Sequence, residues 1–250
     1  MPHEVLIDGV LYVPAQEIIQ PPEPPKPVLP PEAGKFVFGP QTVGDRWFPV
    51  SWGDTIPEQL ALEDQDILDA AAYYDVHPAH IDAVRQVEAG STGFLLNEPP
   101  PSRPKILFEG HWFYKLTPEP VSQVRPDLSH PHWTSEHYIG GSGEWTRLRD
   151  AAEFDLPNAL KSASWGLGQV MGFNYEVAGC KSIEDYVVEA FSGEAAQFRH
   201  MLNFIENNNL MDELRRGDWA GFARGYNGSG YAQNQYDKKL AEAAANSKFA

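Results

Sequence analysis

The chain has 250 residues, a formal net charge of −16 at pH 7 and one cysteine. It is long enough to bury a sizeable hydrophobic core. The acidic excess argues against nucleic acid as the main partner, because phosphate binding depends on clustered lysine and arginine. Because Cys180 is alone, an intramolecular disulfide and a thiolate metal cluster are excluded, and we interpret it as a buried or incidental thiol.

The sequence gives no sign of a membrane or export segment. It contains no run of eighteen apolar residues, and its start, MPHEVLIDGVLYVPA, lacks the basic and apolar regions of a secretory signal. We therefore expect a monomer with no membrane insertion, made in the cytoplasm. If its substrate lies outside that compartment, another factor must deliver it.

The N-terminal part predicts three short segments before the main domain. Residues 1–15 contain two apolar runs around Asp8-Gly9, which favours a β-hairpin. Residues 16–35 are rich in proline and predict an extended, semi-rigid linker. Residues 36–57 are aromatic and irregular, and we interpret them as a strap packed on the following domain rather than as a ligand-contacting surface.

The stretch IDAVRQVEAGSTGF carries the most informative residue of the chain, Glu88. Ile81, Val84 and Glu88 share one face of a helix that Pro78 opens and Gly90 ends. Burial on this apolar face would raise the pKa of Glu88 and keep it protonated near neutral pH, as a general acid requires. On the helix alone, a solvated glutamate near the apolar stripe is the simpler explanation.

The region after this helix predicts a small β element and a long loop. Residues 105–116, KILFEGHWFYKL, predict a strand or hairpin with Glu109 and His111 on one face. Residues 117–143 predict a surface loop. Its group HPHWTSEH contains metal-binding residue types, but their spacing matches no ligand pattern, and we expect no metal.

Helical periodicity dominates the remainder, so we predict a mainly α domain over residues 58–250 with one small β element after its second helix. The predicted helices cover about residues 58–74, 78–89, 144–155, 157–163, 166–171, 182–191, 193–208, 218–225 and 233–246.

Three motifs follow one another in order: VEAGSTGF, ASWGLGQVMG and ARGYNGSG. Each has an ordinary packing explanation by itself. Together they form the arrangement of a helix-ending Glu, then a Ser/Gly segment with Gln169, then a helix end that breaks at a Tyr-Asn-Gly turn, which is seen in goose-type lysozymes and soluble lytic transglycosylases. From about residue 58 to 247 the chain resembles most closely the phage-type N-acetylmuramidase family of endolysin catalytic domains.

The resemblance implies a lysozyme-like fold and a role for each matching residue. It makes Glu88 the catalytic acid that protonates the glycosidic oxygen. Ser164 and Gln169 would line the cleft, and Tyr226 with Asn227 would contact the sugar or its N-acetyl group. This agrees with the chemistry of glycosidases, which need a protonated acid in an apolar setting.

Glu109 is the candidate for the second carboxylate, which would activate water. An inverting enzyme separates its two carboxyl groups by ~6.5–9.5 Å and a retaining enzyme by ~5–5.5 Å. The alternative is a structural Glu109 paired with His111, Arg103 or Lys105, and the sequence leaves both roles open.

The expected activity is hydrolysis of the β-1,4 bond between N-acetylmuramic acid and N-acetylglucosamine in peptidoglycan, by a phage endolysin that needs no cofactor. The alternatives are a lytic transglycosylase, a non-catalytic wall-binding or tail-associated module, and a chitinase-like enzyme. The acidity is unlike many wall-lytic proteins, so we expect affinity to come from the sugar cleft, helped by a local basic patch near Arg147, Arg149 and Lys161.

Overall fold

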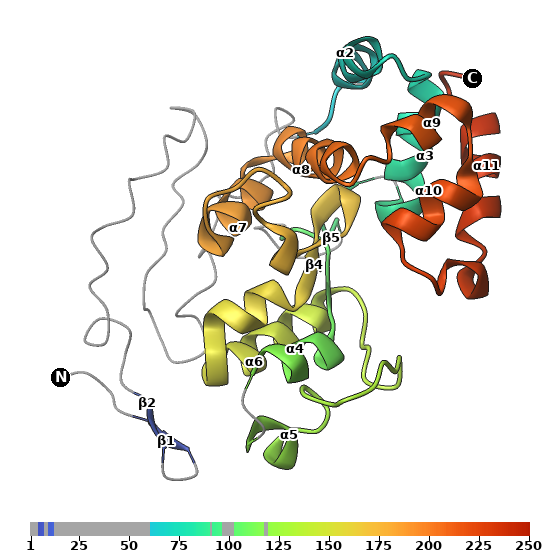
Figure 1. Ribbon diagram of the computed structural model, residues 1–250. Helices are drawn as coiled ribbons and strands as arrows, with labels where there is room; N and C mark the ends of the chain where they lie inside the picture. Colours follow the sequence, from blue (N-terminus) through green and yellow to red (C-terminus); the bar gives the residue numbers. More distant parts are fainter. Residues whose placement is uncertain (1–4, 8–9, 13–60, 91, 97–102, 118–119) are drawn as a thin grey trace. The chain divides into compact units, whose positions relative to one another are not determined.

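The structure is a computed structural model that describes residues 5–7, 10–12, 61–90, 92–96, 103–117 and 120–250 (Figure 1). The chain divides into two compact units, residues 1–33 and 34–250. In the first unit, strands β1 (Val5–Ile7) and β2 (Val10–Tyr12) pair antiparallel, which confirms the predicted hairpin. The predicted linker (16–35) and the predicted strap (36–57) lie outside the described residues. The boundaries of both segments therefore stay predictions.

The second unit is mainly α-helical with one small sheet, as the sequence predicts. The described helices are α2 (Asp64–Tyr74), α3 (Pro78–Ala89), α4 (Gly110–Leu116), α5 (Pro120–Val124), α6 (Ser142–Lys161), α7 (Ile183–Ser192), α8 (Glu194–Asn207), α9 (Met211–Arg216), α10 (Trp219–Tyr226) and α11 (Tyr236–Ala245). The strands are β3 (Ile106–Phe108), β4 (Ala163–Trp165) and β5 (Val170–Met171), and the short 3-10 helices are η2 (Gly166–Gly168), η3 (Gly172–Asn174) and η4 (Tyr231–Asn234).

The sheet has the strand order β3-β4-β5, with both pairs antiparallel. β4 and β5 are joined by the tight turn η2, in which Gly166 and Gln169 have φ angles of 63° and 47°. The short helix predicted near residues 166–171 is therefore correct only for the 3-10 turn Gly166–Gly168, because a left-handed residue at each end of the turn reverses the chain into the strand Val170–Met171.

The strand predicted over residues 105–116 is correct only for its first part. The backbone N–H of Glu109 donates to Ser162 O at 2.9 Å, and the carbonyl of Glu109 then accepts from Trp112 and Phe113. Glu109 thus ends the sheet contacts and occupies the N-cap position of α4. The aromatic residues that suggested a longer strand instead belong to a short helix, which buries Phe113.

Other helix limits also differ from the sequence-based expectation. α2 begins at Asp64, where Glu63 and Asp66 form a capping box, and not near residue 58. α6 runs across the two helices predicted around residue 156, and its non-helical residue Asp155 (φ −155°) lies at the predicted break, before Pro157. The short helices α4, α5 and α9 were not predicted, because helices of five to seven residues show too little periodicity to detect.

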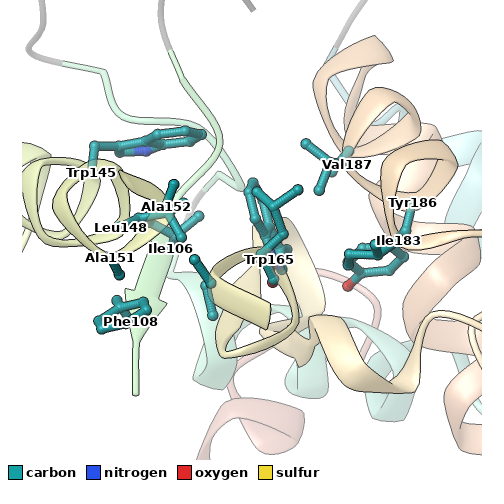
Figure 2. Packing of buried hydrophobic residues seen from close by; sticks show 14 of the residues in the cluster. Ile106, Phe108, Trp145, Leu148, Ala151, Ala152, Trp165, Ile183, Tyr186 and Val187 are labelled. Atoms are coloured by element: carbon teal, nitrogen blue, oxygen red, sulfur yellow. Dashed lines mark hydrogen bonds between the residues drawn. The ribbon is translucent and has the colours of Figure 1, made fainter. Parts of the chain in front are cut away.

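The helices form two groups with the small sheet between them. In Figure 1, α3 and α9–α11 lie together on one side of β4 and β5, and α4 with α6 lies on the other. Each group has its own buried cluster. In the cluster of α6 and α7, the ring of Trp165 lies between side chains of α6, such as Trp145, and side chains of α7, such as Tyr186 (Figure 2). Burial of side chains of this size stabilises a fold by roughly 2–3 kcal/mol each.

Candidate active site

The helix that carries Glu88 begins and ends as its sequence predicts. The Nδ1 atom of His77 accepts a hydrogen bond from Ala79 N at 3.3 Å, Pro78 is the first helical residue, and Gly90 is the C-cap with φ 70°. Because Ile81 and Val84 are 0% exposed, the apolar stripe is confirmed. Glu88 therefore lies in the last turn, on the same side as the buried stripe.

The pKa values of two carboxyl groups on α3 are shifted in opposite directions. Asp82 is buried and accepts hydrogen bonds from Arg85, Gln86 and Ser247, which outweigh the effect of its burial and lower its pKa. Around Glu88, burial raises the pKa to about 7, although a hydrogen bond and a nearby lysine act in the other direction. Of the two, Glu88 is thus the carboxyl group that keeps its proton up to about pH 7.

Asn227 is the hydrogen-bond partner of Glu88. Its Nδ2 donates to Glu88 Oε1 at 2.8 Å, although the two residues are 139 positions apart. Its own Oδ1 is buried and has no hydrogen-bond partner among the described residues. Asn227 follows α10, so the third sequence motif reaches the acid of the first through this side chain. The remaining charge near Glu88 is Lys239 of α11, which lowers the pKa of Glu88.

The side chain of Glu109, which follows β3, accepts a hydrogen bond from a tyrosine hydroxyl. Tyr138 Oη donates to Glu109 Oε2 at 2.6 Å. Burial raises the pKa of Glu109 more than the hydrogen bond from Tyr138 and the charge of Arg147 lower it. His111 Nδ1 lies 3.1 Å from the same oxygen but without hydrogen-bond geometry, and burial lowers its pKa to about 4. His111 is therefore neutral near pH 7, and its contact with Glu109 is not an ion pair.

The charges of Glu88 and Glu109 both raise the pKa of Tyr236. Burial raises the pKa of this phenol first, and the charges of Glu88 and Glu109 raise it further. Tyr236 is the first residue of α11, and it is partly buried against the α3 cluster. The charges of both carboxyl groups therefore reach Tyr236.

The prediction of a basic patch near Arg147, Arg149 and Lys161 is wrong for Arg147. The Arg147 side chain is 5% exposed and pairs with Glu144 at 2.8 Å. It also donates to Phe108 O at 2.7 Å, directly before Glu109. A guanidinium committed to buried partners offers nothing to an anionic wall, and Arg147 instead fixes the end of β3.

Ser164, Gln169 and Tyr226 are brought together, but by hydrogen bonds within the protein. Ser164 Oγ donates to Gln169 Oε1 at 2.9 Å, and Gln169 Nε2 donates to Gly166 O at 2.8 Å. Tyr226 Oη donates to Gly168 O at 2.7 Å. The three side chains thus fasten the β4–β5 turn to itself and to α10, next to the Asn227 that contacts Glu88.

A buried polar pair on α8, which the sequence analysis did not identify, fixes the turn after Glu88. Glu194 Oε1 accepts from Gly93 N at 2.8 Å and from the Thr92 hydroxyl. Gln197 Oε1 accepts from Leu167 N at 2.9 Å, so α8 joins the turn after α3 to the β4–β5 turn. Both side chains lie four residues before buried apolar residues of α8 and could have been found by helical periodicity.

Trp133 is a second residue that the sequence analysis did not single out. It is 58% exposed, and its side chain interacts with Tyr138, the partner of Glu109. It lies inside the HPHWTSEH segment, which attracted attention for its histidines. An exposed indole offers a flat apolar face on which a sugar ring could stack, and Tyr138 links this one to Glu109.

Among the described residues, one group of side chains has metal-ligand atoms close together: Cys180, Glu189 and His200. Neither the histidines of HPHWTSEH nor the two carboxyl groups Glu88 and Glu109 belong to it. Cys180 is buried, as expected.

Comparison with known proteins agrees with this geometry. The model of the Muramidase family, described as N-acetylmuramidase, matches residues 77–248. The chain belongs to the N-acetylmuramidase family. Among solved structures, it is similar to the crystal structure of Burkholderia AP3 phage endolysin, with 32% identity, a TM-score of 0.66, and coverage of 75% of this chain and 72% of that chain. No curated protein matches.

Membership of this family makes the chain a lysozyme-like glycoside hydrolase with peptidoglycan as its substrate class, and it confirms the lysozyme-like, mainly α fold. The match covers all three motifs and both candidate carboxylates. Within the described part of the chain, no helix is long and apolar enough to cross a membrane.

Proposed function

We propose that this N-acetylmuramidase is an endolysin that hydrolyses the β-1,4 bond between N-acetylmuramic acid and N-acetylglucosamine, with Glu88 as general acid. The observation that carries the proposal is the desolvated carboxyl group of Glu88, whose pKa of about 7 keeps a proton available near neutral pH. The similarity to a phage endolysin supports the biological role.

In the proposed reaction, Glu88 gives its proton to the glycosidic oxygen as the bond to the sugar's anomeric carbon breaks. Asn227, whose amide already contacts the carboxyl group, stabilises the carboxylate that remains. Water then adds to the anomeric carbon and loses a proton to a base. Each cycle therefore leaves one reducing end and one free hydroxyl group.

We propose Glu109 as that base. Its buried setting raises its pKa and makes the ionised form a stronger proton acceptor. The hydrogen bond from Tyr138 fixes Oε2 of this carboxylate. The joint influence of Glu88 and Glu109 on Tyr236 supports a substrate position between them. Trp133 would stack on a sugar ring at the Glu109 side.

The decisive experiment compares the wild type with Glu88→Gln on purified peptidoglycan sacculi and analyses the products by mass spectrometry. Glu153→Gln is the matched control, because Glu153 is an exposed carboxylate of α6. We expect reducing muramic ends from the wild type and the control, and a loss of about 10²–10⁴-fold in turnover for Glu88→Gln, the range that general acid catalysis contributes.

The same products separate the alternatives. Anhydromuramic ends would replace hydrolysis by lytic transglycosylation, in which a muramic hydroxyl takes the place of water. Binding to sacculi without any release of fragments would indicate a non-catalytic wall-binding module, and cleavage of chitin oligomers at a similar rate would overturn the muramic specificity. If Glu109→Gln retains near wild-type turnover while Glu88→Gln is inactive, Glu109 is not the base.

A further inference from the structure

Three side chains with metal-binding atoms converge at α7 and α8, and the proposed reaction uses none of them. Cys180 precedes α7, Glu189 lies in the C-terminal half of α7, and His200 lies in the middle of α8. Cys180 Sγ is 3.3 Å from His200 Nε2 and 3.5 Å from Glu189 Oε2, and His200 Nε2 is 2.9 Å from Glu189 Oε2. One donor atom of each residue therefore points to a common centre.

The size of this triangle matches a tetrahedral zinc site. Bonds of ~2.3 Å to sulfur and ~2.0–2.1 Å to nitrogen or oxygen put the donor atoms of such a site ~3.3–3.6 Å apart. The circle through the three observed positions has a radius of about 1.9 Å, close to the ~2.0 Å base of a tetrahedron with these bonds. An ion could bind slightly above the plane with shifts of a few tenths of an ångström.

The donor set also fits zinc in its chemistry. Thiolate, neutral imidazole and carboxylate are its usual ligands in proteins. Burial lowers the pKa of His200 more than the nearby carboxylate raises it, so the imidazole is neutral near pH 7. Burial raises the pKa of the Cys180 thiol, so binding would release the thiol proton to solvent.

The surroundings resemble the outer shell of a metal site. Arg199 Nη2 donates to Glu189 Oε2 at 2.7 Å, which orients the carboxylate. Tyr186 stacks on the His200 ring at 4.5 Å and fixes its plane. His200 is 2% exposed and Cys180 7%, whereas the Glu189 side chain is 38% exposed. Solvent therefore reaches the site from the Glu189 side, where a water molecule could complete the tetrahedron.

We propose that Cys180, Glu189 and His200 bind one Zn²⁺ ion that ties the segment before α7 to both helices of the α7–α8 pair. Its role is structural, because Cys180 and His200 are buried and Tyr186 connects His200 to the β4–β5 hairpin through a hydrogen bond to Val170 O at 2.9 Å. The proposal does not depend on the muramidase activity, and its test needs no substrate.

The test uses the full chain, freed of metal with a chelator and titrated with Co²⁺ as a spectroscopic probe for the zinc site. We expect one equivalent to bind with a thiolate-to-cobalt charge-transfer band in the near ultraviolet, and added Zn²⁺ to abolish the band. We also expect Zn²⁺ to raise the Tm of the wild type. Cys180→Ser should lose the band and bind Zn²⁺ at least about 100-fold more weakly, since it removes a direct ligand.

His132→Ala is the control, because His132 is exposed in the histidine-rich loop and outside the cluster. It should titrate like the wild type. Glu189→Gln, which keeps the side-chain shape, provides a second ligand variant if Cys180→Ser folds poorly, as judged by far-ultraviolet circular dichroism. A wild type that shows no charge-transfer band, or ligand variants that bind as tightly as the wild type, would mean that the three side chains form only a hydrogen-bonded network.

Discussion

Replacing Glu88 by glutamine should make the protein more stable at pH 8 while it removes activity. Glu88 has its pKa raised from 4.5 to about 7 in the folded protein by burial. The unfolded chain therefore releases this proton as the pH rises past 4.5, whereas the folded chain retains it until about pH 7. Because the unfolded state binds fewer protons in this interval, stability decreases from pH 4.5 to 7 and then stays level.

The size of the effect follows from the same two values. Each tenfold difference in acidity is worth about 1.4 kcal/mol, so the charged form of Glu88 costs the folded state about 3 kcal/mol above pH 7. Residual contact with water reduces this to roughly 2–3 kcal/mol. Glutamine keeps the shape and cannot ionise, so Glu88→Gln should lack this cost at pH 8 and show little gain at pH 4.5.

The assay is equilibrium unfolding in guanidinium chloride, for the wild type and Glu88→Gln, at pH 4.5 and pH 8. Glu153→Gln serves as the control for a lost surface carboxylate and should change stability by less than about 0.5 kcal/mol at both pH values. A stability difference between the wild type and Glu88→Gln that is the same at both pH values would refute the reasoning, because it would mean that burial does not raise the pKa of Glu88.

Three further outcomes test the surroundings of the two carboxyl groups. Asn227→Ala removes the donor that lowers the pKa of Glu88, so the alkaline limb of the kcat/KM profile should move up by about one pH unit; an unchanged limb would contradict the contact. Tyr138→Phe removes the hydrogen-bond donor that lowers the pKa of Glu109, so the acidic limb of the kcat/KM profile should also move to higher pH. A shift of this limb to lower pH would mean that it does not report the ionisation of Glu109. Trp133→Ala should raise KM about tenfold with little change in kcat on soluble glycan fragments, as expected for a lost stacking surface, whereas an unchanged KM would place the sugar elsewhere.

Local patterns predicted several elements well, because their causes lie within a few residues. Pro78 and Gly90 delimit α3 through backbone geometry, and the spacing of Ile81 and Val84 alone specifies the buried face. The pairing of β1 with β2 likewise joins two runs that are only a few residues apart. Such features need no knowledge of the rest of the chain.

Where the prediction was wrong, a distant contact outweighed the local preference. The sequence predicts a strand for residues 110–116, but the hydrogen bond from Glu109 N to Ser162 O is the last contact with the neighbouring segment, and α4 begins directly after it. Arg147 looked like part of a basic surface, but Glu144 and the carbonyl of Phe108 draw it inside. Glu144 is a neighbour on the same helix, but the carbonyl groups of Phe108 and Ser162 cannot be recognised as partners from neighbouring residues.

The sequence by itself determined that Glu88 lies at the end of an apolar helix face and that three motifs follow in the order typical of N-acetylmuramidases. Only the tertiary structure decided that Asn227 contacts Glu88 and that Tyr138 holds Glu109. The reason is physical: helix formation depends on spacing and caps within one segment, whereas the pKa of a carboxyl group depends on which distant segments remove its water and which donors they bring.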